Sequence, residues 1–201
     1  MTARPIREKE REMTKNDYTA TISAKITAKE AIDRISRVPD WWTKGFMGAS
    51  EKPGDIFTVR FGETFVDFQV IELIPEKRIV WQVTDCNLYF VPNKKEWNHT
   101  RVVWEVSSDK GLTTVRMTHV GLVPEHQCYE NCERGWNFYV TESLRKLLTE
   151  NKGLPDGSLT VKLKAAMAEL RAAAKRAPYT DDEIEDMDLD AALAALKLHG
   201  R

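Results

Sequence analysis

Six segments between residues 18 and 121 alternate between apolar and polar positions, and a period of two is typical of half-buried β-strands. Turn sequences separate the last five segments, among them Gly62-Glu63 and Asp109-Lys110-Gly111. The pattern therefore predicts a six-stranded antiparallel sheet, built from YTATISAKIT, DIFTVRF, TFVDFQVIELI, RIVWQVTDC, TRVVWEVSS and TTVRMTHVG.

Two other segments have the period of an α-helix. Thr27 and Glu30 form a capping box that opens a helix over AKEAIDRISRV, and Pro39 ends it. After Pro124, an apolar stripe predicts a second helix of roughly 25 residues, about 38 Å long, that ends near Lys152-Gly153. The stripe comprises Cys128, Cys132, Trp136, Tyr139, Val140, Ser143 and Leu147.

Two connections stand out by their composition. DWWTKGFMG, at residues 40–48, contains paired tryptophans and glycines and predicts a short turn or helix that leans on the fold. NLYFVPNKKEWNH, at residues 87–99, is too polar and too interrupted for a core strand. It predicts a loop over one edge of the sheet, and loops of this length often gate a site.

The order of these elements is strand, helices, five strands and long helix, which predicts an α+β fold with one domain over residues 17–155. A strongly curved sheet can wrap around the long helix and leave a cavity between them. Residues 1–16 are expected to form a flexible charged arm. Residues 156–201 are expected to form a helical hairpin whose apolar stripes pack on this domain, on a second copy or on a protein partner. The strand positions expected to face the long helix are Ile79, Trp81, Val83, Val102, Trp104, Val106, Val115, Met117 and His119.

Charge and composition exclude several classes of partner. The chain of 201 residues has 30 Lys+Arg against 31 Asp+Glu, so its net charge of -1 creates no field that would recruit nucleic acid or anionic lipid. No apolar run is long enough for a signal peptide or a membrane span, and we therefore expect a cytoplasmic protein without membrane insertion. Three cysteines do not suggest a disulfide framework, so reduced thiols are expected.

Several motifs carry a resemblance to a known family: DWWT, ELIPEKRIVWQVTD, Glu96-Trp97 and THVGLVPEHQCYENCERGWNFYVTESLRKLLTENKG. Over about residues 17–155 the chain resembles the START-like or SRPBCC superfamily, and within it the branch named after the activator of the heat-shock protein 90 ATPase. The resemblance implies the helix-grip fold and a ligand-binding cavity, but no settled reaction. Related members include lipid carriers, plant hormone-binding proteins and aromatic polyketide cyclases.

We expect this cavity to bind a small hydrophobic or aromatic molecule without catalysis and without a cofactor. His119 and Tyr139 pair a polar group with a predicted inner position, so we expect them to orient the ligand, with Gln69 as a further candidate. Gln69 shares one strand face with Asp67, and exposure to solvent is the alternative for both. Two alternatives are a chaperone-accessory or protein-interaction module, and a cyclase-like or lyase-like enzyme that uses His119 for proton transfer. The candidate ligand-binding residues are Trp41, Trp42, Phe68, Gln69, Trp81, Trp104, Met117, His119, Cys132, Trp136, Tyr139 and Val140.

The cysteines of the long helix allow more than one interpretation. Cys128 and Cys132 share a helical face, and His126 precedes Cys128 by two residues. We expect buried thiols that let the helix sit close to the sheet, because free cysteine is among the most buried residue types. A structural zinc site needs four ligands, and the sequence shows no second ligand pair, so no metal is expected. A redox pair is the remaining alternative.

Overall fold

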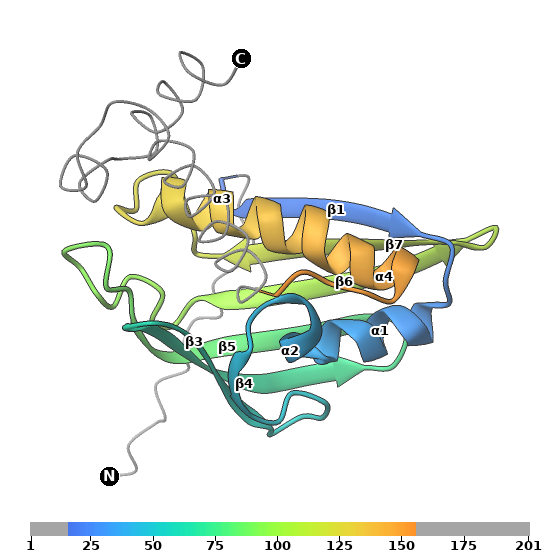
Figure 1. Cartoon of the computed structure of the whole chain (residues 1–201), viewed down its shortest axis with the longest axis horizontal. Coiled ribbons are helices and arrows are strands. Elements are labelled where there is room, and N and C mark those ends of the chain that lie inside the picture. Colours follow the sequence, from blue (N-terminus) through green and yellow to red (C-terminus); the bar gives the residue numbers. More distant parts are fainter. Residues whose placement is uncertain (1–15, 156–201) are drawn as a thin grey trace, which may run out of the picture. The chain divides into compact units, whose positions relative to one another are not determined.

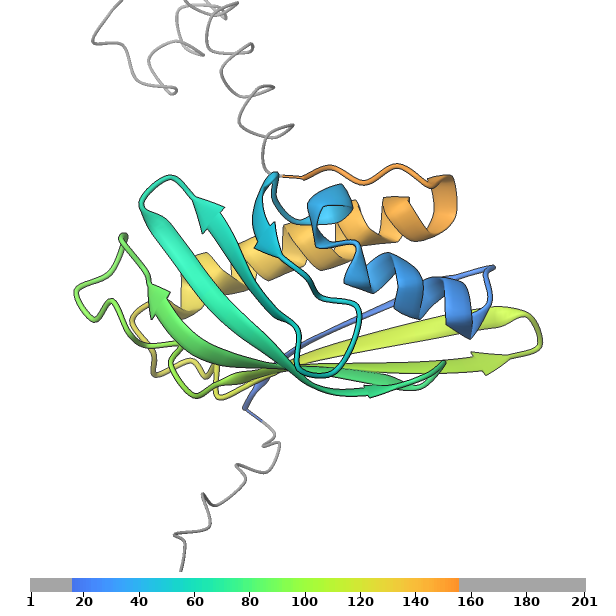
Figure 2. The same ribbon diagram turned by 90° about the horizontal axis from the view of Figure 1, so that it is seen from below.

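One antiparallel sheet forms the base of the fold in the computed structural model, which describes residues 16–155 of the chain. Within these residues the sheet has seven strands in the order β1-β7-β6-β5-β4-β3-β2, so β1 and β2 are its edges. The helices cross one face of the sheet (Figure 1), and the sheet curves around them (Figure 2). The strands are β1 (Tyr18–Ala24), β2 (Gly45–Gly48), β3 (Ile56–Phe61), β4 (Thr64–Ile74), β5 (Arg78–Asn87), β6 (Arg101–Asp109) and β7 (Leu112–Val120).

The predicted strand number of six is wrong by one, because β2 forms in the second half of the segment at residues 40–48. The first half of that segment contains the end of a short helix, as expected. β2 pairs with β3, and its two glycines permit the close approach. A Cβ atom would lie 2.4 Å from the Arg60 carbonyl oxygen at Gly45 and 2.2 Å from the Ile56 carbonyl oxygen at Gly48. With four residues and none of them buried, β2 has no apolar alternation that could reveal it.

Two short helices follow β1. α1 (Ala28–Ser36) begins at the predicted capping box, in which the Glu30 N–H donates to Thr27 Oγ1 at 3.1 Å and the Thr27 N–H donates to the Glu30 carboxylate at 2.9 Å. α2 (Val38–Trp41) has Pro39 in its first turn, where the missing N–H costs no helical hydrogen bond. Pro39 therefore marks the start of α2 as well as the end of α1.

The predicted long helix is a continuous helical run from Tyr129 to Glu150. It comprises α3 (Tyr129–Phe138), the π-helical segment η1 (Tyr139–Leu144) and α4 (Arg145–Glu150), and it ends at Asn151 in the left-handed conformation. The wider π turn inserts an extra residue into the helical repeat, which rotates the buried face by about one position. The buried positions are Cys132, Trp136, Val140, Ser143, Leu144, Leu147 and Leu148.

An aromatic core fills the space between the sheet and the helices. All nine strand residues predicted to face the long helix are buried. Trp104 packs edge-on against Trp41 and Trp81, with ring centroids 5.6 and 5.4 Å apart, and Phe57 stacks on Phe68 at 5.0 Å. These contacts fix the sheet and helices relative to each other and so shape the cavity described below.

Parts of the predicted domain organisation lie outside the residues that the structure describes. The predicted arm, apart from Asn16, and the predicted hairpin at residues 156–201 lie outside the described residues, and so does the partner surface assigned to the hairpin. Over residues 16–155, no helix combines the length and the apolar composition that a membrane crossing requires.

Candidate functional site

A cavity of about 350 Å³ lies between α3 and one end of the sheet. Its walls come from four places: the facing ends of β3 and β4, the loop between β5 and β6, the first half of the long helix, and Trp42 at the end of α2. Most of the lining is apolar and much of it is aromatic. The lining residues are Trp42, Val59, Phe61, Thr64, Val66, Leu88, Phe90, Trp97, Asn131, Cys132, Gly135, Trp136 and Tyr139.

Ring contacts hold the walls of this cavity together. The Trp42 and Trp136 rings lie 4.7 Å apart, Trp97 stacks on Trp136 at 5.9 Å, and Phe61 meets Tyr139 at 5.7 Å. Gly135 leaves part of the helix surface open, because a Cβ atom built there has no neighbour within 4 Å. The cavity is thus walled by aromatic rings in mutual contact, and it has open space beside Gly135 of α3.

Four of the predicted site residues lie together on the cavity wall, namely Trp42, Cys132, Trp136 and Tyr139. Other predicted site residues are fully buried in the core behind the lining, where several of their rings pack against Trp42. These are Trp41, Phe68, Trp81, Trp104, Met117 and Val140.

Gln69 lies on the outer face of the sheet. Its neighbours Phe68 and Val70 are buried on the inner face, whereas Gln69 is half-buried and alternates away from them. The structure therefore does not place this amide at the cavity, in agreement with the solvent-facing alternative and not with a role in orienting a ligand.

His119 is the centre of a closed hydrogen-bond chain in the core. Its Nδ1 accepts from the Trp136 indole Nε1–H at 3.0 Å, so the neutral ring carries its proton on Nε2, which donates to Thr100 Oγ1 at 2.9 Å. Thr100 in turn donates to the Trp97 carbonyl oxygen at 2.6 Å. Burial, with a smaller contribution from nearby His126, lowers the pKa of His119 to about 3.

Both His119 nitrogens are therefore engaged, and the ring does not line the cavity. A general acid or base needs a nitrogen within reach of the substrate. This geometry gives the cyclase-like or lyase-like alternative no support. His119 positions Trp136, and through it the cavity wall.

Sequence reasoning missed the part of the lining that comes from the β3–β4 hairpin and from the loop between β5 and β6. These lining residues are Val59, Phe61, Thr64, Val66, Leu88, Phe90 and Trp97. The alternation marks Val59 and Val66 as inner positions, but it does not show which end of the sheet stays uncovered. Trp97 could have been identified as a site residue, because Glu96-Trp97 is one of the motifs that carry the family resemblance.

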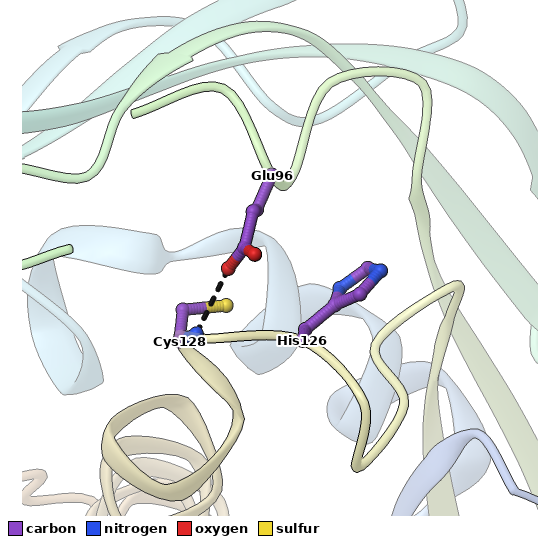
Figure 3. A group of neighbouring side chains, drawn as sticks. All are labelled: Glu96, His126 and Cys128. Carbon is purple, nitrogen blue, oxygen red and sulfur yellow. Dashed lines mark hydrogen bonds between the residues drawn. The ribbon is translucent and has the colours of Figure 1, made fainter. Parts of the chain in front are cut away.

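A second group of polar side chains lies beside the cavity, at the start of α3. Ligand atoms of Glu96, His126 and Cys128 all lie within 4.8 Å of one another. Figure 3 shows Glu96 reaching from the loop between β5 and β6 toward the turn that carries the other two. The Glu96 carboxylate accepts from the backbone N–H groups of Gln127 at 3.0 Å and Cys128 at 2.8 Å.

The pKa values of Glu96 and of the neighbouring Cys132 shift in opposite directions. Partial burial raises the pKa of Glu96, but the hydrogen bonds from the Cys128 and Gln127 N–H groups outweigh it, so the net shift is downward and the carboxylate is favoured. One helical turn away, the interaction with the Cys128 thiol, followed by burial, raises the pKa of Cys132 and favours its protonated form.

A comparison with protein families matches residues 30–149, more than half of the chain, to the family described as Activator of Hsp90 ATPase homolog 1-like protein. A comparison with curated proteins gave no match.

Among solved structures, the chain is similar to an Aha1 from Colwellia psychrerythraea, described as a dimer, with a TM-score of 0.55 and 23% identity over 68% of this chain and 98% of that one. It is also similar to DynU16, a putative protein of the dynemicin biosynthetic locus, with a TM-score of 0.54 and 18% identity over 70% of this chain and 49% of that one. Protein MLL2253 from Mesorhizobium loti gives a TM-score of 0.51 and 17% identity over 65% of this chain and 96% of that one. These likenesses confirm the helix-grip fold, and the chain belongs to the family of Activator of Hsp90 ATPase homolog 1-like proteins within the START-like superfamily.

Proposed function

We propose that this protein binds a small hydrophobic or aromatic molecule in the cavity between α3 and the β3–β4 end of the sheet, without catalysing a reaction. The cavity itself carries the proposal: it measures about 350 Å³ and is walled mainly by aromatic and aliphatic side chains. Small-molecule sites are typically apolar clefts of about 300–1,000 Å³ with a few polar groups. The volume favours a compact ligand.

Affinity at such a site comes from burial of apolar surface. At about 25 cal/mol per Å², a ligand that buries roughly 300 Å² gains about 7 kcal/mol before the costs of binding are subtracted. Thr64, Asn131 and Tyr139 contribute polar atoms to the lining. These side chains also interact within the protein: Thr64 Oγ1 accepts from the Tyr89 N–H at 3.2 Å, Asn131 accepts from Arg134, and the Tyr139 ring meets that of Phe61. Apolar contact therefore dominates recognition.

Gly135 provides a direct test, because it lines the cavity and a Cβ atom added there has no neighbouring heavy atom within 4 Å. We expect Gly135→Trp to fill the cavity and to abolish the fluorescence enhancement of the hydrophobic dye 1-anilinonaphthalene-8-sulfonate that the wild-type protein gives. The matched control is Gly135→Ala, which adds one methyl group and should retain dye binding. Both variants should be as stable as the wild type or more stable by about 0.5–1 kcal/mol, because glycine is unfavourable inside a helix.

Dye binding that survives in a folded Gly135→Trp variant would show that the dye sits elsewhere and would remove this cavity as the site. Competition then identifies the ligand class: hydrophobic and aromatic molecules should displace the dye from the wild-type protein, whereas hydrophilic sugars and nucleotides should not.

A further inference from the structure

The group formed by Glu96, His126 and Cys128 has the chemistry of a metal site. It offers a carboxylate oxygen, an imidazole nitrogen and a sulfur, and these are the three kinds of ligand that zinc accepts in proteins. The ligand atoms lie within 4.8 Å of one another, whereas ligands of a tetrahedral ion with bonds of about 2.0–2.3 Å lie roughly 3.5 Å apart. A contraction of about 1 Å therefore completes the geometry.

The Glu96 side chain is already oriented for such a role. Its two oxygens each accept one backbone N–H, from Gln127 and from Cys128, and each oxygen keeps a second lone pair. Carboxylates that bind metals are commonly held by hydrogen bonds of this kind. The same two bonds could serve only to cap the start of α3, but capping gives no reason for an imidazole and thiols to gather at the same point.

Two buried donors or acceptors beside the group lack partners within residues 16–155. His126 Nδ1 is buried and forms no hydrogen bond. The Trp97 side chain is only 6% exposed, and its indole N–H, which lies near the Cys132 thiol, has no hydrogen-bond partner of normal geometry. Buried polar groups without partners are uncommon, and a deprotonated Cys132 would accept from this N–H.

We infer that Glu96, His126 and Cys128 bind a divalent cation of the zinc class, with Cys132 as the fourth ligand. Cys132 lies one helical turn after Cys128, its N–H donates to the Cys128 carbonyl oxygen at 2.9 Å, and its thiol interacts with that of Cys128. Its sulfur lies outside the group whose ligand atoms are within 4.8 Å of one another, so Cys132 joins only when the ion draws the ligands together. Binding removes the protons of both thiols, since the thiolate is the form that ligates the ion. The sequence alone conceals this site, because Glu96 lies about thirty residues before the other ligands and reaches them only through the fold.

Cobalt(II) substitution tests the site with the full-length protein. Chelator-treated protein titrated with Co²⁺ should develop a thiolate-to-cobalt charge-transfer band and the visible bands of tetrahedral cobalt, and Zn²⁺ should displace both. Cys128→Ser and His126→Ala should lose these bands, and Cys132→Ser should lose part of the charge-transfer intensity. The matched control is Cys86→Ser: Cys86 is also buried, but its thiol donates to the Lys94 carbonyl oxygen and does not belong to the group, so the bands should persist.

Glu96→Gln keeps the shape of the side chain but loses the negative charge, and its single amide oxygen retains one of the two backbone N–H hydrogen bonds, so it weakens helix capping less than metal binding. We expect this variant to stay folded and to bind Zn²⁺ at least about 10- to 100-fold more weakly. Absence of thiolate-to-cobalt bands in the wild-type protein, or their persistence in both Cys128→Ser and His126→Ala, would overturn the assignment. If Cys128→Ser does not fold, His126→Ala decides the test, because His126 lies half-buried in a loop and its replacement should leave the fold intact. Persistence of the cobalt bands in that variant would then overturn the assignment. Dye binding in the Gly135 variants is measured without metal, so the two proposals fail independently.

Discussion

His119 shows how one buried polar side chain organises its surroundings. Trp136 brings an indole N–H into the core, and an unpaired buried donor costs free energy. His119 Nδ1 accepts that hydrogen, and Thr100 accepts from the other ring nitrogen, so every polar atom of the ring is satisfied. This histidine is therefore a positioning residue for the cavity wall, and its one ring proton, on Nε2, is held in the hydrogen bond to Thr100 and not directed at a ligand.

This environment predicts a pH dependence of stability. The folded-state pKa of about 3 lies below the ordinary value of 6.5, so the unfolded chain binds the proton first as the pH falls. The contribution of His119 to stability is complete above about pH 6.5 and is lost progressively toward pH 3, by up to about 1.4 kcal/mol per pH unit. Urea unfolding of His119→Gln between pH 7.5 and 4.5 should show lower stability at pH 7.5 but a shallower decline.

The exposed His99→Asn variant controls for the removal of a histidine, and asparagine suits its left-handed backbone conformation. If the free energy of unfolding declined equally steeply with pH in His119→Gln and in the wild type, the pKa of His119 would not differ between the folded and unfolded states.

At the level of elements, α1 is fastened to the end of the long helix by one side chain. Arg34 donates to the carbonyl oxygens of Leu147 and Leu148 at 3.0 and 2.7 Å, in the last turn of α4, where carbonyl groups lack helical partners. We expect Arg34→Ala to lower the free energy of unfolding by about 2 kcal/mol, because hydrogen bonds from a charged group to partly buried acceptors are lost. Chemical denaturation followed by circular dichroism measures this difference.

Lys29→Ala is the matched control on the same helix. Lys29 pairs with Asp33 at 2.6 Å, but its side chain is 70% exposed, and exposed pairs contribute little. The denaturation midpoint should stay close to that of the wild type. A similar loss of unfolding free energy in both variants would mean that α1 is sensitive to any side-chain truncation. The hydrogen bonds of Arg34 to the two carbonyl groups would then have no stabilising effect of their own.

The sequence predicts most elements but only part of the site, and the reason is physical. Alternation and capping are local, so β4, β7 and α1 can be predicted from neighbouring residues. β2 depends on backbone approach at its glycines, and η1 depends on tertiary packing, so neither has a local pattern. The cavity and the Glu96 group depend on where a loop between two strands comes to lie, which hydrophobic periodicity does not encode.

For the described domain as a whole, the loop between β5 and β6 joins the two proposed sites. It contributes Leu88, Phe90 and Trp97 to the cavity wall and Glu96 to the candidate cation site, and Cys132 belongs to both. A cation held between Glu96 and the start of α3 would restrict this loop. Two ligands that share an ordered segment are thermodynamically coupled, and the coupling acts equally in both directions.

We therefore expect saturating Zn²⁺ to tighten binding of 1-anilinonaphthalene-8-sulfonate by about fivefold or more, and the dye to tighten Zn²⁺ binding by the same factor. Dye titrations with and without Zn²⁺ measure the first factor, and Zn²⁺ titrations with and without the dye measure the second. Glu96→Gln should keep dye binding at the metal-free wild-type level and lose its response to Zn²⁺. If the wild type binds Zn²⁺ but its affinity for the dye does not change, the cation leaves the cavity wall unaltered, and the loop between β5 and β6 does not couple the two sites.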